Sequence, residues 1–152
     1  MNANSLRLVG ALAAVAMALA APAGAATALA GRYTYPAAGT VYDTKTKLTW
    51  QQTAPSATYA WADAKTYCAG VGATLGGTGW RLPTMKELQT IVDESRSIPS
   101  IDPTAFPGAP AADFWSSSPV AGSPSLAWYV NFSLGFSNYG GMTFAGDVRC
   151  VR

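Results

Sequence analysis

The sequence contains two cysteines, Cys68 and Cys150, and they are its most reactive side chains. There is no histidine among the 152 residues. That absence excludes Ser-His-Asp and Cys-His catalysis and every histidine-containing zinc site. Two cysteines are also too few for a zinc site built from cysteine ligands alone. We therefore expect no metal, no cofactor and no catalytic residues, and the chemistry left to the two sulfurs is a disulfide bond.

The first 25 residues have the pattern of a secretory signal peptide. Arg7 supplies the positive charge, residues 8–20 are apolar, and Ala23-Gly24-Ala25 is a cleavage motif. The alternative is a retained membrane anchor, but the apolar run is shorter than the roughly 20 residues that span a bilayer. We predict a signal peptide over 1–25, a flexible leader over 26–31, and an exported protein (periplasmic, cell-surface or extracellular) with no membrane span after cleavage.

Export places the cysteines in an oxidising environment, where they are expected to pair. Cys68 falls in a helical pattern and Cys150 in the closing strand pattern. A disulfide would therefore tie the first helix to the last strand. Chain-entropy models assign roughly 4–5 kcal/mol to closing a loop of this length. The alternative is two buried free thiols.

Charge and length limit the class of protein. Cleavage after Ala25 leaves 127 of the 152 residues, enough for one domain over 32–152. Arg7 is the only charge in the signal, so nine of the ten Lys and Arg remain against eight Asp and Glu. A nearly neutral chain without a basic stripe is not typical of nucleic-acid-binding proteins.

The N-terminal half predicts a hairpin followed by a helix. Strand formers occupy 32–35, 41–42 and 48–52, and the last two runs flank a polar turn over 43–46. We expect Leu48 and Trp50 to face inward. Thr58 is the expected N-cap of the helix. Apolar residues then recur at helical spacing at Trp61, Ala64, Cys68 and Val71.

A glycine-rich loop is expected over 70–79, before the second helix. Its run 76–79 superficially resembles a phosphate-binding loop, but no P-loop lysine follows, so a structural turn is favoured. Thr84 and Glu87 form the capping box of the second helix. Leu88, Ile91 and Val92 give this helix its apolar face, and a long proline-containing connection follows over 93–113.

The C-terminal part predicts β structure, so the fold class is α+β with two helices on small antiparallel sheets. A short strand opens at 114–115, and 127–133 alternates with Trp128, Val130 and Phe132 directed inward. A turn is expected over 138–141 and a last strand over 147–152. Asp147 and Arg149 would share the exposed face of that strand as a weak ion pair.

Charged side chains give weak evidence for catalysis. Asp93 and Glu94 are the paired carboxylates that glycoside hydrolysis would need, but adjacent helical side chains diverge, which favours solvated surface charge. Arg81 has the planar fork that recognises anions. We favour a structural role, in which Arg81 pairs with a carboxylate or buried carbonyls near the second helix.

Aromatic and amide side chains suggest a binding surface near the end of the chain. Rings stack on the C–H faces of sugars, and amides bond to hydroxyl groups. Tyr129 and Asn131 point away from the expected core face, and Asn138 and Tyr139 fall in the expected turn. These four residues are our ligand-binding candidates. The alternative is that they only complete the sheet and its turn.

Several motifs together resemble the Lcl C-terminal domain family over about 40–152. The main one is Trp80-Arg81-Leu82-Pro83-Thr84, preceded by Gly79 and followed by Glu87-Leu88. The others are Val41-Tyr42-Asp43, Leu48-Thr49-Trp50, Trp61-Ala62-Asp63-Ala64, Phe114-Trp115-Ser116-Ser117-Ser118 and the closing run 148–152. The resemblance implies a C-type-lectin-like fold with a disulfide from the first helix to the last strand. The Arg-Leu-Pro-Thr run is also similar to one in formylglycine-generating enzymes.

The resemblance implies a binding or adhesion domain for an extracellular glycan or a polyanionic polysaccharide. The calcium-dependent lectin triplets are missing. Formylglycine-generating enzymes use a reactive cysteine pair that binds copper, whereas the two cysteines of this sequence are expected to be committed to the structural disulfide. A polyanion would also require a local cluster of Lys and Arg. The alternative functions are a protein-binding scaffold of the cell envelope and, least favoured, a degenerate oxidase or a carboxylate hydrolase.

Overall fold

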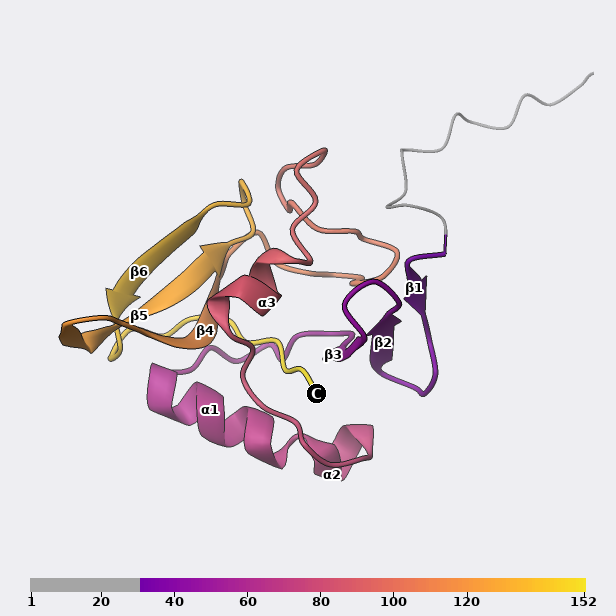
Figure 1. Ribbon diagram of the computed structural model, residues 1–152, viewed down its shortest axis with the longest axis horizontal. Helices are drawn as coiled ribbons and strands as arrows, with labels where there is room; N and C mark the ends of the chain where they lie inside the picture. The colour runs from indigo at the N-terminus through magenta and orange to yellow at the C-terminus, as the bar shows by residue number, and fades with distance from the viewer. Residues whose placement is uncertain (1–30) are drawn as a thin grey trace, which may run out of the picture.

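The computed structural model describes residues 31–152, so the predicted signal peptide and residues 26–30 of the predicted leader lie outside the described part. The first sheet is antiparallel and contains β1 (Tyr33–Thr34), β2 (Thr40–Asp43) and β3 (Leu48–Gln51) in that order. Val41 pairs with Trp50, and both are fully buried. The predicted hairpin is confirmed (Figure 1).

The second sheet is also antiparallel and contains β4 (Asp113–Val120), β5 (Ser123–Asn131) and β6 (Ser137–Gly141). The prediction of a turn over 138–141 was wrong, because those residues form β6. The chain reverses earlier, where the Asn131 Oδ1 accepts the backbone N–H groups of Ser133 and Leu134. The Gly135 N–H then donates to the Asn131 carbonyl. A side chain at the end of β5 therefore makes the turn.

The first helix, α1 (Trp61–Gly70), begins later than predicted. Its N-cap is Ala60, so Thr58 does not cap it. Tyr59 forms an antiparallel bridge with Gly146, which holds the backbone extended up to that point. The Trp61 N–H donates to the Met142 carbonyl, which satisfies one free donor of the first turn. Long-range pairing thus overrides the local capping preference.

Two shorter helices follow. α2 (Gly72–Leu75) lies within the segment predicted as a glycine-rich loop, which corrects that prediction for residues 72–75. α3 (Met85–Gln89) begins with the predicted capping box. The Thr84 hydroxyl accepts the Glu87 N–H, and the Glu87 carboxylate accepts the Thr84 N–H. No helix in the described part of the chain is long and apolar enough to cross a membrane.

The C-terminal segment joins both sheets without forming a strand ladder, so the predicted last strand over 147–152 was wrong. Asp147 bridges Phe114 of β4 in parallel, whereas Val151 bridges both Trp50 of β3 and Arg81. The segment therefore makes isolated bridges with three separate parts of the chain instead of a continuous ladder with one strand. In Figure 1 this yellow segment runs from the second sheet towards the first.

The predicted disulfide is confirmed. Cys68 on α1 is bonded to Cys150 in the C-terminal segment, across 82 residues of sequence, and both cysteines are fully buried. The described residues contain no free cysteine. The fold is α+β with two small antiparallel sheets and a long-range disulfide.

Two hydrophobic clusters lie on opposite sides of the second sheet. The first cluster joins β2, β3, α3 and the 93–113 connection to the face of the second sheet that carries Phe114, Val130 and Phe132, which we name the closed face. The second cluster joins α1 and the disulfide to the face that carries Trp115, Ala127 and Tyr129, which we name the open face. Buried side chains therefore lie on both faces of the second sheet, whereas the sequence predicted a core on one face only.

Arg149 is fully buried, so the predicted exposed ion pair with Asp147 was wrong. Its Nη1 donates to the Gln51 carbonyl at 2.8 Å and also to the Gln52 carbonyl. The guanidinium carbon lies 4.6 Å from the centre of the Phe106 ring. Burial lowers the pKa of Arg149 to about 9. Backbone carbonyls and aromatic rings therefore replace a carboxylate as partners of this cation.

Candidate functional site

The family-like motif at 80–87 is structural. Arg81 makes two hydrogen bonds to the Glu87 carboxylate, at 2.8 and 2.6 Å, which confirms the predicted pairing with a carboxylate. Trp80 is buried and its Nε1 donates to the Gly76 carbonyl at 2.8 Å, while Leu82 and Pro83 are also buried. The hydrogen bonds from Arg81, then those from Thr84, lower the pKa of Glu87 to about 2. The Arg81 guanidinium is thus occupied by the Glu87 carboxylate of the same chain.

The predicted carboxylate pair is also engaged in local structure. Asp93 accepts the backbone N–H and the hydroxyl of Ser95 and forms an ion pair with Arg96 at 3.1 Å. Glu94 is exposed. This arrangement fits the interpretation of solvated surface charge. Across residues 31–152, no three His, Cys, Asp or Glu side chains gather as metal ligands do.

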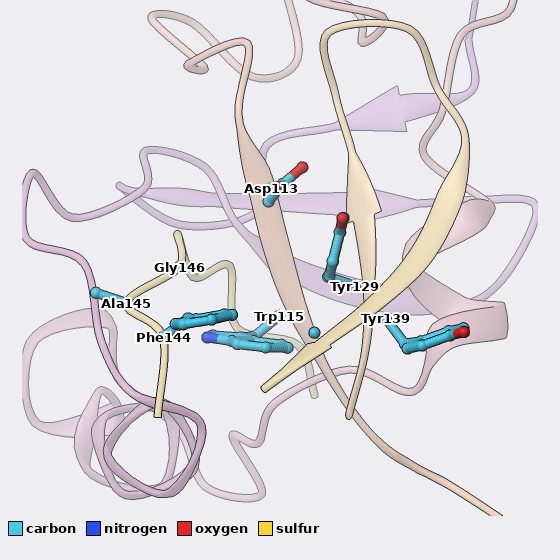
Figure 2. Close-up of a pocket in the computed structure, with 8 residues that line it drawn as sticks. Asp113, Trp115, Tyr129, Tyr139, Phe144, Ala145 and Gly146 are labelled. Carbon is cyan, nitrogen blue, oxygen red and sulfur yellow. The ribbon is translucent and has the colours of Figure 1, made fainter. Parts of the chain in front are cut away.

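The four predicted ligand-binding residues lie on neighbouring strands but not on one face. Tyr129 pairs with Asn138 across β5 and β6, and Asn131 is two residues further along β5, so these three share the open face. Tyr139 pairs with Trp128 and packs edge-on against its ring on the other face. Figure 2 shows the Tyr139 ring directed away from the other aromatic rings. The structure therefore brings Tyr129, Asn131 and Asn138 onto one face and leaves the Tyr139 side chain on the other.

A pocket of about 180 Å³ opens on this face, between β4, β6 and the segment that follows β6. Its aromatic lining residues are Trp115, Tyr129, Tyr139 and Phe144, of which Tyr139 directs its ring away from the other three (Figure 2). Trp115 and Tyr129 meet edge-to-face with their centroids 6.0 Å apart. The Trp115 indole is buried and held by a hydrogen bond of 3.0 Å from its Nε1 to the Tyr59 carbonyl. Phe144 is 67% exposed.

Glycine at two positions makes room for these rings. A Cβ at Gly140 would lie 3.5 Å from the Tyr129 ring, 3.7 Å from Trp115 and 3.8 Å from Phe144, so the three rings converge on that glycine. A Cβ at Gly146 would lie only 2.8 Å from the Trp115 Nε1. The absence of a Cβ at Gly146 therefore makes room for the Trp115 indole itself. A Cβ at Gly140 would only come into ordinary contact with the three rings, so this glycine leaves space in the pocket.

Carboxylates form one side of the site. The Asp113 Oδ1 accepts a hydrogen bond of 2.7 Å from the Asn131 amide. Asp113 also lines an adjoining hollow that contains Asn131 and Asp147. The Asp147 N–H donates to the Asp113 carbonyl at 2.9 Å, and the Trp115 N–H donates to the Asp147 carbonyl at 3.0 Å. These backbone bonds hold the two acidic residues side by side.

Burial and then the charge of Asp113 raise the pKa of Asp147 above its ordinary value. The same two causes, in the same order, raise the pKa of Tyr129, whose phenol therefore remains a neutral hydrogen-bonding group. The site thus offers aromatic surface, one phenol, one amide and two carboxylates. This set is suited to non-covalent recognition of a small ligand with an apolar surface and hydrogen-bonding groups.

Sequence reasoning missed Asp113, Trp115, Phe144 and Asp147 as site residues. Two signals in the sequence could have indicated the first three. Asp113 and Trp115 are two residues apart in a strand and so share a face. The pair Gly140-Gly141 ends β6, and glycine in a strand often marks the close approach of another group; here those groups are the Tyr129, Trp115 and Phe144 rings.

Comparison with known protein families gives a match over nearly all of the residues that the structure describes. The family model of the Lcl C-terminal domain matches residues 39–152. No curated protein matches the sequence.

Proposed function

The chain belongs to the Lcl C-terminal domain family, and from this premise we propose that it is an exported, non-catalytic binding domain for an extracellular glycan. We propose further that its α+β fold is of the C-type-lectin-like kind. The disulfide supports export, because such bonds persist in oxidising compartments. Adhesion or surface recognition is the role that such a domain would serve.

The single observation that carries this proposal is the pocket formed by Trp115, Tyr129 and Phe144 with Asp113 and Asn131 beside it. An aromatic ring can stack on the apolar face of a sugar ring, while carboxylate and amide groups bond to its hydroxyls. The volume of about 180 Å³ is below the roughly 300–1,000 Å³ of pockets for drug-sized ligands. It suits one sugar residue or part of one.

A glycan array tests the proposal. We expect the mature domain to bind a subset of glycans and Phe144→Ala to lose that binding. Phe136→Ala is the matched control, because Phe136 is also an exposed phenylalanine (46%) but does not line the pocket. Binding to no glycan, or equal losses in the two variants, would contradict the assignment of this pocket.

A second candidate function is a protein-binding module of the cell envelope. An exposed apolar patch favours it. Ile98 and Leu134 are 73% and 66% exposed, and the Ile98 N–H donates to the carbonyl of Ser133, next to Leu134. If this patch binds a protein, Leu134→Asp should reduce capture of that protein from the envelope, whereas Phe144→Ala should not.

Oxidase activity of the formylglycine-generating kind is the least supported alternative. Such chemistry would require reactive thiols, and both sulfurs here are bonded to one another and buried. The measurement that would revive it is copper binding with oxygen uptake by the unreduced protein, lost in Cys68→Ser.

A further inference from the structure

Two carboxylates, those of Asp113 and Asp147, lie at the aromatic pocket and the hollow beside it. Asp113 is exposed, and Figure 2 shows Tyr129 extending towards it. Asp147 lies in the hollow that adjoins the pocket. Within residues 31–152, neither hollow is lined by a lysine or an arginine. The side chains that face a bound ligand are therefore neutral or negative.

Burial and then the charge of Asp113 raise the pKa of the Asp147 carboxyl by more than the charge of Arg149, two residues away, lowers it. The Arg149 guanidinium donates to the Gln51 and Gln52 carbonyls and lies over the Phe106 ring, in the first cluster. The side chain is fully buried. Arg149 therefore cannot contact a ligand on the open face.

We infer that the pocket selects a glycan residue that carries an ammonium group, such as an amino sugar, over neutral and sulfated residues. This inference depends on the proposed glycan-binding function and names the class of sugar. It also opposes the polyanionic ligand expected from the sequence, because sulfate groups would meet two carboxylates of like charge.

Two interactions would recognise the ammonium group. An ammonium near an aromatic face is attracted by the ring quadrupole, and Phe144 and Tyr129 both line the pocket. The Asp113 carboxylate can accept charge-assisted hydrogen bonds from the same group. A neutral N-acetyl group in the same position would gain neither the charge attraction nor the cation–π contact.

The test compares three probes on the unreduced mature domain by isothermal titration calorimetry. They are a glucosamine oligomer at a pH that keeps its amines protonated, the N-acetylglucosamine oligomer of the same length, and a heparin oligosaccharide. We expect the glucosamine oligomer to bind most tightly and heparin not to bind. Asp113→Asn should weaken glucosamine binding about fivefold, as expected for the loss of one exposed charge pair, and leave binding of the N-acetyl oligomer unchanged.

The matched control is Glu94→Gln, which removes another exposed carboxylate that lines neither hollow. It should change the affinity for none of the probes. Equal affinity for the two glucosamine forms, with loss of both in Phe144→Ala, would overturn the inference and leave the proposed function intact. Tighter binding of heparin would also overturn it. Failure of every glycan to bind would overturn the proposed function and the inference together.

Discussion

The two faces of the second sheet differ, although successive residues of the same strand supply them. Phe114 on the closed face is fully packed and meets the Phe132 ring edge-on at 5.1 Å. Trp115, the next residue, is equally buried but borders a pocket, because Gly140 and Gly146 place no side chains against it. A small sheet therefore combines one fully packed face with a second face on which glycines leave a pocket.

The largest effect should come from opening the closed face. Phe114→Ala removes a fully buried ring from the first cluster, and we expect it to lower the free energy of unfolding by about 3–5 kcal/mol. Phe144→Ala on the open face should change it by less than about 0.5 kcal/mol. Denaturant unfolding followed by tryptophan fluorescence measures both. Similar losses for the two variants would show that the faces do not divide these roles.

The disulfide should support the open face more than the closed one, because both cysteines belong to the second cluster. We expect Cys68→Ser with Cys150→Ser to lower the free energy of unfolding by about 2–4 kcal/mol. Hydrogen exchange should accelerate first in α1 and in the C-terminal segment, while the β2–β3 pairs retain their protection. Uniform acceleration across the chain would contradict a local role for the bond.

Two glycine substitutions distinguish the packing of the Trp115 indole from the space available to a ligand in the pocket. Gly146→Ala puts a methyl group 2.8 Å from the Trp115 Nε1, and we expect a loss of about 1–3 kcal/mol in unfolding free energy. Gly140→Ala puts one at 3.5 Å from the Tyr129 ring, so stability should be retained while ligand binding weakens. The two variants need both a denaturation curve and a binding isotherm. An equal loss of stability in Gly140→Ala would mean that the pocket is already closed in solution.

The smallest effect concerns α3, which covers the closed face through Leu88. The folded-state pKa of Glu87, about 2, is below its ordinary value of 4.5, so the carboxylate stabilises the fold above pH 4.5 and that contribution disappears as the pH falls towards 2. Glu87→Gln should therefore cost about 1 kcal/mol at neutral pH, the size of a typical cap. The difference from the wild-type domain should vanish in acid. Thermal unfolding across this pH range measures it, and a difference that persists at pH 2 would contradict the assigned role of the charge.

Sequence reasoning succeeded where the signal was local or covalent. The capping box of α3 needs only Thr84 and Glu87 at the right spacing, and the cysteines had one possible partner within the chain. The β2–β3 hairpin likewise depends on neighbouring residues. These features survive in any fold that accepts the local conformation.

It failed where a distant partner decided the outcome. Thr58 has the chemistry of a cap, but the pairing of Tyr59 with Gly146 keeps the backbone extended beyond it. Arg149 reads as a surface charge, but carbonyls 98 and 97 residues away receive it in the interior. In the candidate site, too, local patterns indicated some residues and distant partners determined the others. Strand alternation placed Tyr129 and Asn131 on one face, whereas Asp147 reaches the site only because its backbone pairs with Asp113, 34 residues earlier in the chain.

The C-terminal segment also has a consequence for biosynthesis. Its backbone bonds to β3, to Arg81 and to β4, and Val148, Cys150 and Val151 complete the two clusters. All of these partners leave the ribosome before the segment does. Neither cluster is complete until residues 147–151 have been made, so the domain cannot finish folding before its C-terminal segment emerges.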